Sequence, residues 1–112
     1  MVNRSKKKGT AQETAIVNWL NDIGIRARRV TLSGANDKGD IELLDFPVII
    51  EAKNEKRMTL SEYVDEANRE GDNAGNKIGI VWHKRRGKAS PGQHYVTMDG
   101  NQLVNLLRLI KS

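Results

Sequence analysis

The sequence has no cysteine and few aromatic residues. Without cysteine, a disulfide framework and a cysteine-based zinc site are both excluded. His83 and His94 are too few and too far apart for a histidine zinc motif. Aromatic residues make up only 4% of the chain, which gives no support to an aromatic platform for stacking single-stranded bases.

Long apolar runs are also missing. No run approaches the roughly 18–20 residues that span a bilayer. The polar, basic start of the chain has no apolar stretch behind it, so a secretory signal is not expected. We therefore expect a cytoplasmic protein that does not contact a membrane and carries no small-molecule cofactor.

Positive charge, in contrast, is plentiful. The chain has 19 Lys and Arg against 14 Asp and Glu, with a net charge of +5, which favours a polyanionic partner. The basic residues form three clusters, namely Arg4, Lys6, Lys7 and Lys8; Arg26, Arg28 and Arg29; and Lys84, Arg85, Arg86 and Lys88. Each cluster alone fits a solvated surface equally well, but together they favour phosphate binding. No DNA-reading helix motif is recognised, so we expect recognition of shape and phosphates rather than of base sequence.

The length of 112 residues predicts a single domain over residues 1–112, without internal repeats. Hydrophobic periodicity and turn residues predict an α/β fold, with a central mixed sheet flanked by helices. The expected helices are residues 11–22, residues 60–70 with a capping box at Thr59 and Glu62 and an end at Gly71, and a last helix capped by Asp99 with Leu103, Leu106, Leu107 and Ile110 on one face. The expected strands are residues 27–32, 40–44, 48–53, 77–82 and 95–98.

The hairpin from Asp40 to Lys53 holds the most informative pattern. A tight turn at residues 45–47 puts Asp40 opposite Glu51, and strand alternation puts Lys53 on the same face. Two carboxylates and an amine therefore converge at one end of the hairpin. Opposed carboxylates destabilise a sheet unless something neutralises them, and a divalent cation such as Mg²⁺ does so, with Mn²⁺ as a substitute.

This set fits metal-assisted phosphodiester hydrolysis. Carboxylate-held metal ions supply a nucleophilic water and neutralise charge on the phosphate. We expect Asp40 and Glu51 to be metal ligands, with the backbone carbonyl of Ala52 as a further ligand, and Lys53 to orient or activate the attacking water. The alternative is a surface ion-pair cluster, which the apolar neighbouring strand argues against.

Glu13 is a further candidate. On a helical wheel it lies within the apolar stripe, where an acid is costly without a partner, so it either joins the metal site or supports it. The alternative is local, because Thr10 followed by Glu13 is also a capping-box pattern.

The sequence Gly39-Asp40, followed after ten residues by Glu51-Ala52-Lys53, resembles the PD-(D/E)xK motif of the restriction-endonuclease-like nucleases. The basic start with Glu13, and the loop Ser33-Gly34 ahead of Asp40, resemble archaeal-type Holliday-junction resolvases over roughly residues 3–83. The Asp40–Glu51 spacing is short for those enzymes, which suggests a tighter hairpin.

The resemblance implies a restriction-endonuclease-like core in the order α-β-β-β-α-β and a Mg²⁺-dependent homodimer that cuts four-way DNA junctions. It implies Glu13, Asp40, Glu51 and Lys53 as the catalytic set, with Ser33 assisting, and contacts from Arg4 and residues 6–8 to the DNA backbone. For Ser33 a turn role beside Gly34 is equally good.

Three alternatives to a junction resolvase stay open. The same kind of nuclease can act on flaps, nicks, or repair or restriction targets. A basic nucleic-acid-binding module without activity comes from a different class, although it has no reason to keep acids at a phosphate site. An RNA-binding accessory protein has only the net charge in its favour. Glu42 has no assigned role, being either a support for the site or simply exposed.

Overall fold

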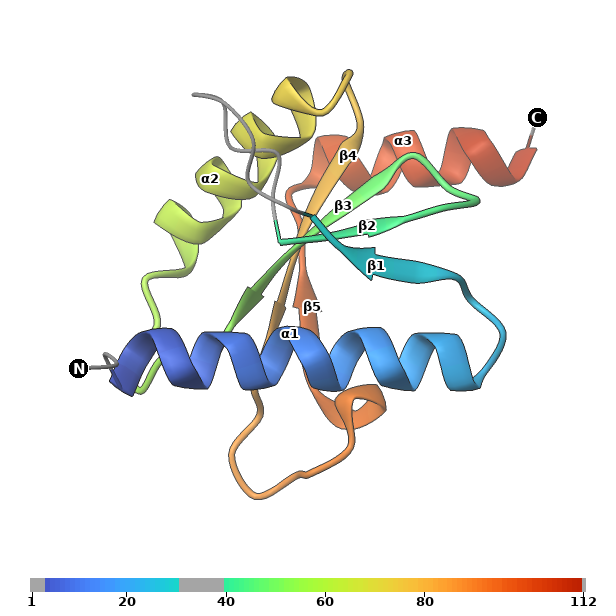
Figure 1. Ribbon diagram of the computed structural model, residues 1–112. Helices are drawn as coiled ribbons and strands as arrows, with labels where there is room; N and C mark the ends of the chain where they lie inside the picture. Colours follow the sequence, from blue (N-terminus) through green and yellow to red (C-terminus); the bar gives the residue numbers. More distant parts are fainter. Residues whose placement is uncertain (1–3, 31–39, 112) are drawn as a thin grey trace.

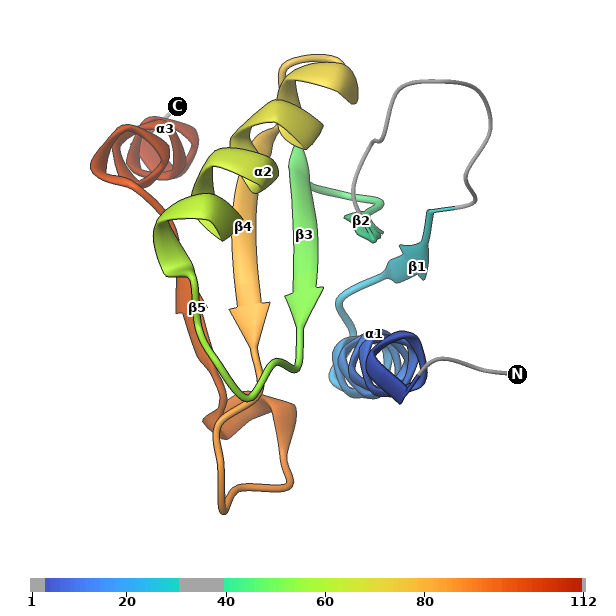
Figure 2. The same cartoon turned by 90° about the vertical axis from the view of Figure 1, so that its left-hand side faces the viewer.

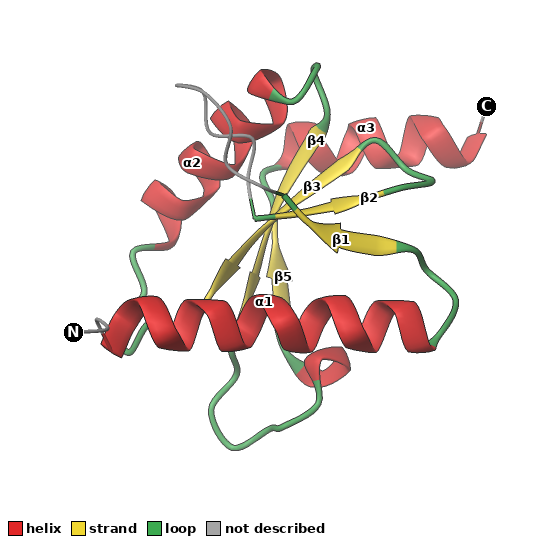
Figure 3. Cartoon of the chain, in the orientation of Figure 1, coloured by secondary structure: helices red, strands yellow, loops and turns green. Residues whose placement is uncertain are grey.

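A computed structural model of the chain describes residues 4–30 and 40–111, with side chains described from residue 10 onward in the first helix. The chain forms an α/β structure in which helices flank a mixed, five-stranded sheet (Figures 1 and 3). Its elements are α1 (Arg4–Asp22), β1 (Ala27–Arg29), β2 (Ile41–Leu43), β3 (Val48–Lys53), α2 (Leu60–Asn73), β4 (Ile78–His83), the 3₁₀ turn η1 (Pro91–Gln93), β5 (Tyr95–Thr97) and α3 (Gly100–Lys111). This confirms the predicted fold class and the predicted order of helices and strands.

The sheet runs in the order β1-β2-β3-β4-β5. Its described strand pairs are antiparallel except β3 with β4, which are parallel. In the β2–β3 hairpin, Ile41 lies opposite Ile50. Continuing this register by one residue places Asp40 opposite Glu51, as predicted from the short turn.

The two faces of β3 serve different purposes. Val48, Ile50 and Ala52 enter the main apolar cluster, where they meet Ile16 of α1. Since successive side chains of a strand point to opposite faces, Glu51 lies on the other face. That face is covered by α2, which runs along β3 and β4 (Figure 2). An acid on β3 is therefore directed at a helix rather than at open solvent.

Helix α2 packs closely on β4 because two glycines permit it. A Cβ at Gly79 would collide with the carbonyl oxygen of Ala67, and a Cβ at Gly71 would collide with the carbonyl oxygen of Lys77. The prediction that Gly71 ends the helix is wrong, since α2 continues to Asn73. Gly71 is needed for close packing instead.

Other predicted boundaries also differ. Helix α1 begins at Arg4 rather than near residue 11, so the N-terminal basic cluster lies on its first turns. Strand β1 ends at Arg29 within the predicted span of residues 27–32, of which 31 and 32 lie outside the described residues. The capping box at Thr59 is not formed, because the Thr59 side chain makes no cap hydrogen bond.

The predicted start of the last helix is confirmed, because the amide of Gln102 donates a 2.9 Å hydrogen bond to Asp99 Oδ1. Its predicted apolar face is only partly buried. Leu106 packs against the core, whereas Leu107 is 54% exposed and Ile110 is 80% exposed. Leu103 is exposed as well. Among the described helices, none is both long and apolar enough to cross a membrane.

Trp82 belongs to the core, and the partly buried Trp19 packs against it. Their rings meet edge to face at 6.0 Å, and Trp82 Nε1 donates a 3.1 Å hydrogen bond to the carbonyl oxygen of Pro91. A Cβ at Gly92 would lie 2.6 Å from the Trp19 ring. The turn after the basic loop is therefore fixed to both tryptophans.

Candidate functional site

Asp40 is held at the start of β2 by three hydrogen bonds. Its amide donates to the carbonyl oxygen of Ile50 at 3.2 Å, and its own carbonyl oxygen accepts from Val30 at 2.8 Å. Its Oδ2 accepts a 2.9 Å hydrogen bond from the amide of Ala52. The carboxylate of Asp40 is thus attached to the middle of the Glu51-Ala52-Lys53 segment, where the sequence pattern predicted it.

Glu51 and Lys53 lie on the same face of β3. Lys53 Nζ is 3.4 Å from Glu51 Oε1, and the Glu51 side chain is only 6% exposed. Lys53 Nζ also lies 4.8 Å from the centre of the Tyr63 ring. The predicted convergence of Asp40, Glu51 and Lys53 is therefore present in the structure.

Glu13 extends this group from α1. Burial and then the Asp40 carboxylate raise the pKa of Glu13 to about 7, although Arg29 opposes the shift. Glu13 Oε2 lies 3.4 Å from Arg29 Nη2. The capping-box alternative is wrong, because Thr10 lies inside α1 rather than at its start. Glu13 instead neighbours Asp40.

The acids in this region favour protons or a cation. Burial is the main cause that raises the pKa of Asp40, against the hydrogen bond from the Ala52 amide. Burial, contact with Glu70 and the charge of Asp40 raise the pKa of Glu51 far above its usual range. A positive ion that entered between these carboxylates would remove the cost of their repulsion.

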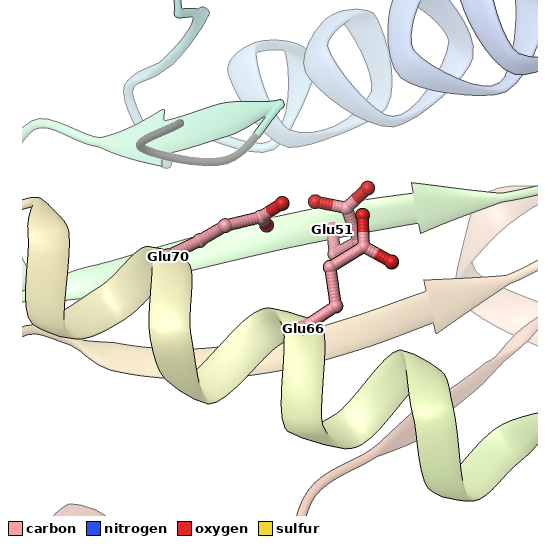
Figure 4. Close-up of side chains that lie close together, drawn as sticks. All are labelled: Glu51, Glu66 and Glu70. Atoms are coloured by element: carbon pink, nitrogen blue, oxygen red, sulfur yellow. The ribbon is translucent and has the colours of Figure 1, made fainter. Parts of the chain in front are cut away.

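Two further acids at the site were not predicted from the sequence. Glu66 and Glu70 of α2 present carboxylate oxygens that lie, with one from Glu51, within 4.8 Å of one another (Figure 4). Lys53 Nζ also lies 3.3 Å from Glu66 Oε2. A signal was available, because Glu62, Glu66 and Glu70 repeat at a spacing of four residues. Such like-charge spacing destabilises a helix unless something compensates for it.

The C-terminal basic cluster lies in the loop after β4, beside the site. The amide of Lys84 donates a 2.9 Å hydrogen bond to the carbonyl oxygen of Lys53. His94 Nε2 donates a 2.8 Å hydrogen bond to the carbonyl oxygen of Lys88, and Gln12 of α1 lies 3.2 Å from His94 Nδ1. The loop is therefore attached at both ends near the acids.

Arg85 differs from its neighbours in this loop. Its guanidinium stacks over Tyr95 at 5.0 Å and contacts the carbonyl oxygen of Gln93. Lys84, Arg86 and Lys88 have no ion pair with an acid of the described residues.

The middle basic cluster is neutralised locally. Arg26 pairs with Asp45, and Arg29 pairs with Glu13. Arg28 pairs with its cross-strand neighbour Glu42, which also lies 3.6 Å from Lys77. Glu42 thus takes part in surface ion pairs. These arginines form ion pairs within the protein, and the expectation that this cluster adds to phosphate binding stays a prediction.

Some predicted site residues have no described side chain. Ser33 lies outside the described residues, as do the side chains of Arg4 and of residues 6–8, whose backbone forms the first turns of α1. Ala52 contributes its amide to Asp40, and its carbonyl stays a predicted ligand.

No protein-family model matches the chain, and neither a curated protein nor a solved structure gives a significant match.

Proposed function

We propose that the chain is a metal-dependent DNA endonuclease with a restriction-endonuclease-like core. The observation that carries this proposal is the 2.9 Å hydrogen bond from the Ala52 amide to Asp40 Oδ2. It fixes the carboxylate at the start of β2 onto the Glu51-Ala52-Lys53 segment of β3. The order of elements and the parallel pairing of β3 with β4 support the same core.

The donor set fits a hard divalent cation. Asp40, Glu51 and Glu13 offer carboxylate oxygens, which Mg²⁺ and Mn²⁺ prefer. Their raised pKa values indicate that the charged groups need a positive partner. Asp40 and Glu51 would hold the ion, with the Ala52 carbonyl as a further ligand and Glu13 beside Asp40. When bound, the ion supplies an activated water and neutralises charge on the scissile phosphate.

Lys53 acts in this proposal as a cation. Burial disfavours its charge, but Glu51 and Glu66 outweigh burial, so the pKa of Lys53 is raised. A lysine that keeps its proton is suited to orient the attacking water and to stabilise the negative charge that develops on the phosphate. It is less suited to remove a proton from that water.

The substrate class follows from charge and from the resemblance in the sequence. Lys84, Arg86 and Lys88 border the site and can track a DNA backbone. We take a four-way junction as the expected substrate, cut by a homodimer, with Ser33 and the basic start of α1 assisting. Sedimentation showing a monomer at working concentration would remove the dimer and with it the symmetric cutting.

The test is cleavage of a labelled four-way junction beside a matched linear duplex, a nicked duplex and a flap. Each is incubated with Mg²⁺ or with a chelator. We expect paired cuts in the junction that are lost with chelator, with Lys53→Ala and with Asp40→Ala, but kept with Lys111→Ala, which removes the same charge from the exposed end of α3.

Asp40→Ala is also expected to bind DNA at least as tightly as the parent, because it removes a negative charge at the phosphate site. Cleavage by Asp40→Ala equal to that of the parent would refute the site. Metal-dependent cutting of flaps or nicks would replace the substrate, and tight binding without any cutting would indicate a non-catalytic binding module.

A further inference from the structure

Glu51 has acidic neighbours in Asp40 and also on α2, since, after burial, Glu70, Asp40 and Glu66 all raise its pKa. Carboxylate oxygens of Glu51, Glu66 and Glu70 lie within 4.8 Å of one another. Figure 4 shows Glu66 and Glu70 extending from α2 toward Glu51 on the strand. The three side chains come from two elements that pack directly together.

A second observation at this cluster points to a ligand. Glu51 is 5% exposed, and its Oε2 is buried without a hydrogen-bond donor among the described residues. Lys53 lies at the other oxygen, 3.4 Å from Oε1. A buried carboxylate oxygen that lacks a donor is costly, so it indicates a positive ion close to Oε2.

The packing of α2 prevents this cluster from relaxing by separation. Gly71 and Gly79 keep the helix in backbone contact with β4. Glu70, which is fully buried, lies one residue before Gly71. The acids therefore stay at close range, and a proton or a bound cation offsets their repulsion.

Charge indicates what binds. Among the described residues, Lys53 pairs with both Glu51 and Glu66, so one ammonium serves two carboxylates and leaves a negative charge when both are ionised. We propose that Glu51, Glu66 and Glu70 hold a divalent cation, Mg²⁺ or Mn²⁺, in addition to the ion of the Asp40 side. Glu51 is shared by the two ions. The proposal rests on the proposed function only for that sharing, since cation binding can be measured without cleavage.

The experiment counts bound Mn²⁺ by electron paramagnetic resonance, titrating the full chain with Mn²⁺ alone. The parent is expected to bind two ions and Asp40→Asn to keep the ion at α2. Glu66→Gln and Glu70→Gln are each expected to weaken one of the two ions by more than about tenfold, since even the partners of metal ligands contribute about 10–100-fold to affinity.

Two variants separate loss of the cation site from a general effect of removing an acid or of disturbing the core. Glu62→Gln removes an exposed acid of α2 one turn before Glu66 and is expected to titrate like the parent. Glu66 is 29% exposed, so Glu66→Gln tests the site without placing an amide in the core.

Parent-like titration of both Glu66→Gln and Glu70→Gln would overturn the proposal, and so would loss of all Mn²⁺ binding in Asp40→Asn. A different result is expected if the proposed nuclease function is wrong and the cation site is right. Asp40→Asn would still bind one ion through Glu66 and Glu70, while the parent would cut no DNA.

Discussion

At the scale of single residues, the carboxyl group of Glu13 is the simplest to test. Burial and the neighbouring Asp40 raise its pKa in the folded chain to about 7, from the usual value of 4.5. The folded state therefore holds a proton that the unfolded state releases. Stability from this proton is complete below pH 4.5 and is lost as pH rises toward about 7.

Thermal unfolding in the presence of chelator tests the raised pKa of Glu13. The melting temperature of the parent is expected to fall as pH rises from about 4.5 to 7. Glu13→Gln is expected to show a shallower fall, because an amide cannot ionise. Glu62→Gln serves as the control, being an exposed acid on another helix. Parallel curves for Glu13→Gln and the parent would refute the raised pKa.

The sequence predicted the positions of some site residues but not of others. Asp40, Glu51 and Lys53 were predictable because a short hairpin fixes its own register. Glu66 and Glu70 were not predicted, because their position over Glu51 depends on how a helix seats on a strand that is distant in sequence. Their regular spacing marked them as unusual without telling which partner they meet.

At the scale of elements, the contact of α2 with β4 sets the position of these acids. The contact depends on Gly79, whose Cα lies against the carbonyl group of Ala67. Any side chain at this point must push the helix away from the sheet. The spacing between the carboxylates of α2 and Glu51 would then increase.

Gly79→Ala is therefore expected to lower the free energy of unfolding by about 1–3 kcal/mol or more, as overpacking does in other cores. Urea unfolding measures this change. Gly100→Ala is the matched control, because a Cβ there meets nothing within 4 Å and Gly100 begins α3. An unfolding curve for Gly79→Ala that superimposes on the parent curve would show that the contact is loose.

The ends of the helices were predictable where nearby residues determine them, but not where packing between distant elements does. The N-terminus of α3 was predictable, since Asp99 caps it through a local hydrogen bond. The start of α1 was not, because the basic run with Gly9 and Thr10 has the composition of a loop end. The end of α2 was misplaced for a tertiary reason, since Gly71 serves the packing on β4.

At the scale of the whole molecule, acids and bases are separated into neighbouring regions. The acids gather around Glu51, while the loop with Lys84, Arg86 and Lys88 begins next to Lys53. A polyanion attracted by the loop would be brought to a site that repels it unless cations are bound. Binding and cleavage should thus respond to different substitutions.

The proposed DNA binding predicts an affinity that depends on salt through this loop. Affinity for a four-way junction, measured by fluorescence anisotropy across a salt series, is expected to fall as salt rises. Removing the charge of one phosphate-contacting residue, as in Arg86→Gln, is expected to reduce the slope of log affinity against log salt by about 1. Arg108→Gln removes the same charge from α3, which lies away from this loop (Figure 1), and is expected to keep the parent slope.

The double variant Lys84→Gln with Arg86→Gln is expected to reduce the magnitude of the slope of log affinity against log salt by about 2, because each of the two charges neutralises its own phosphate. If Arg108→Gln lowered the slope as much as Arg86→Gln, net charge alone would explain binding. A slope near zero for the parent would exclude phosphate tracking altogether. A slope that falls only with the loop variants would place the DNA backbone along residues 84–88, beside Lys53, where the proposed chemistry requires it.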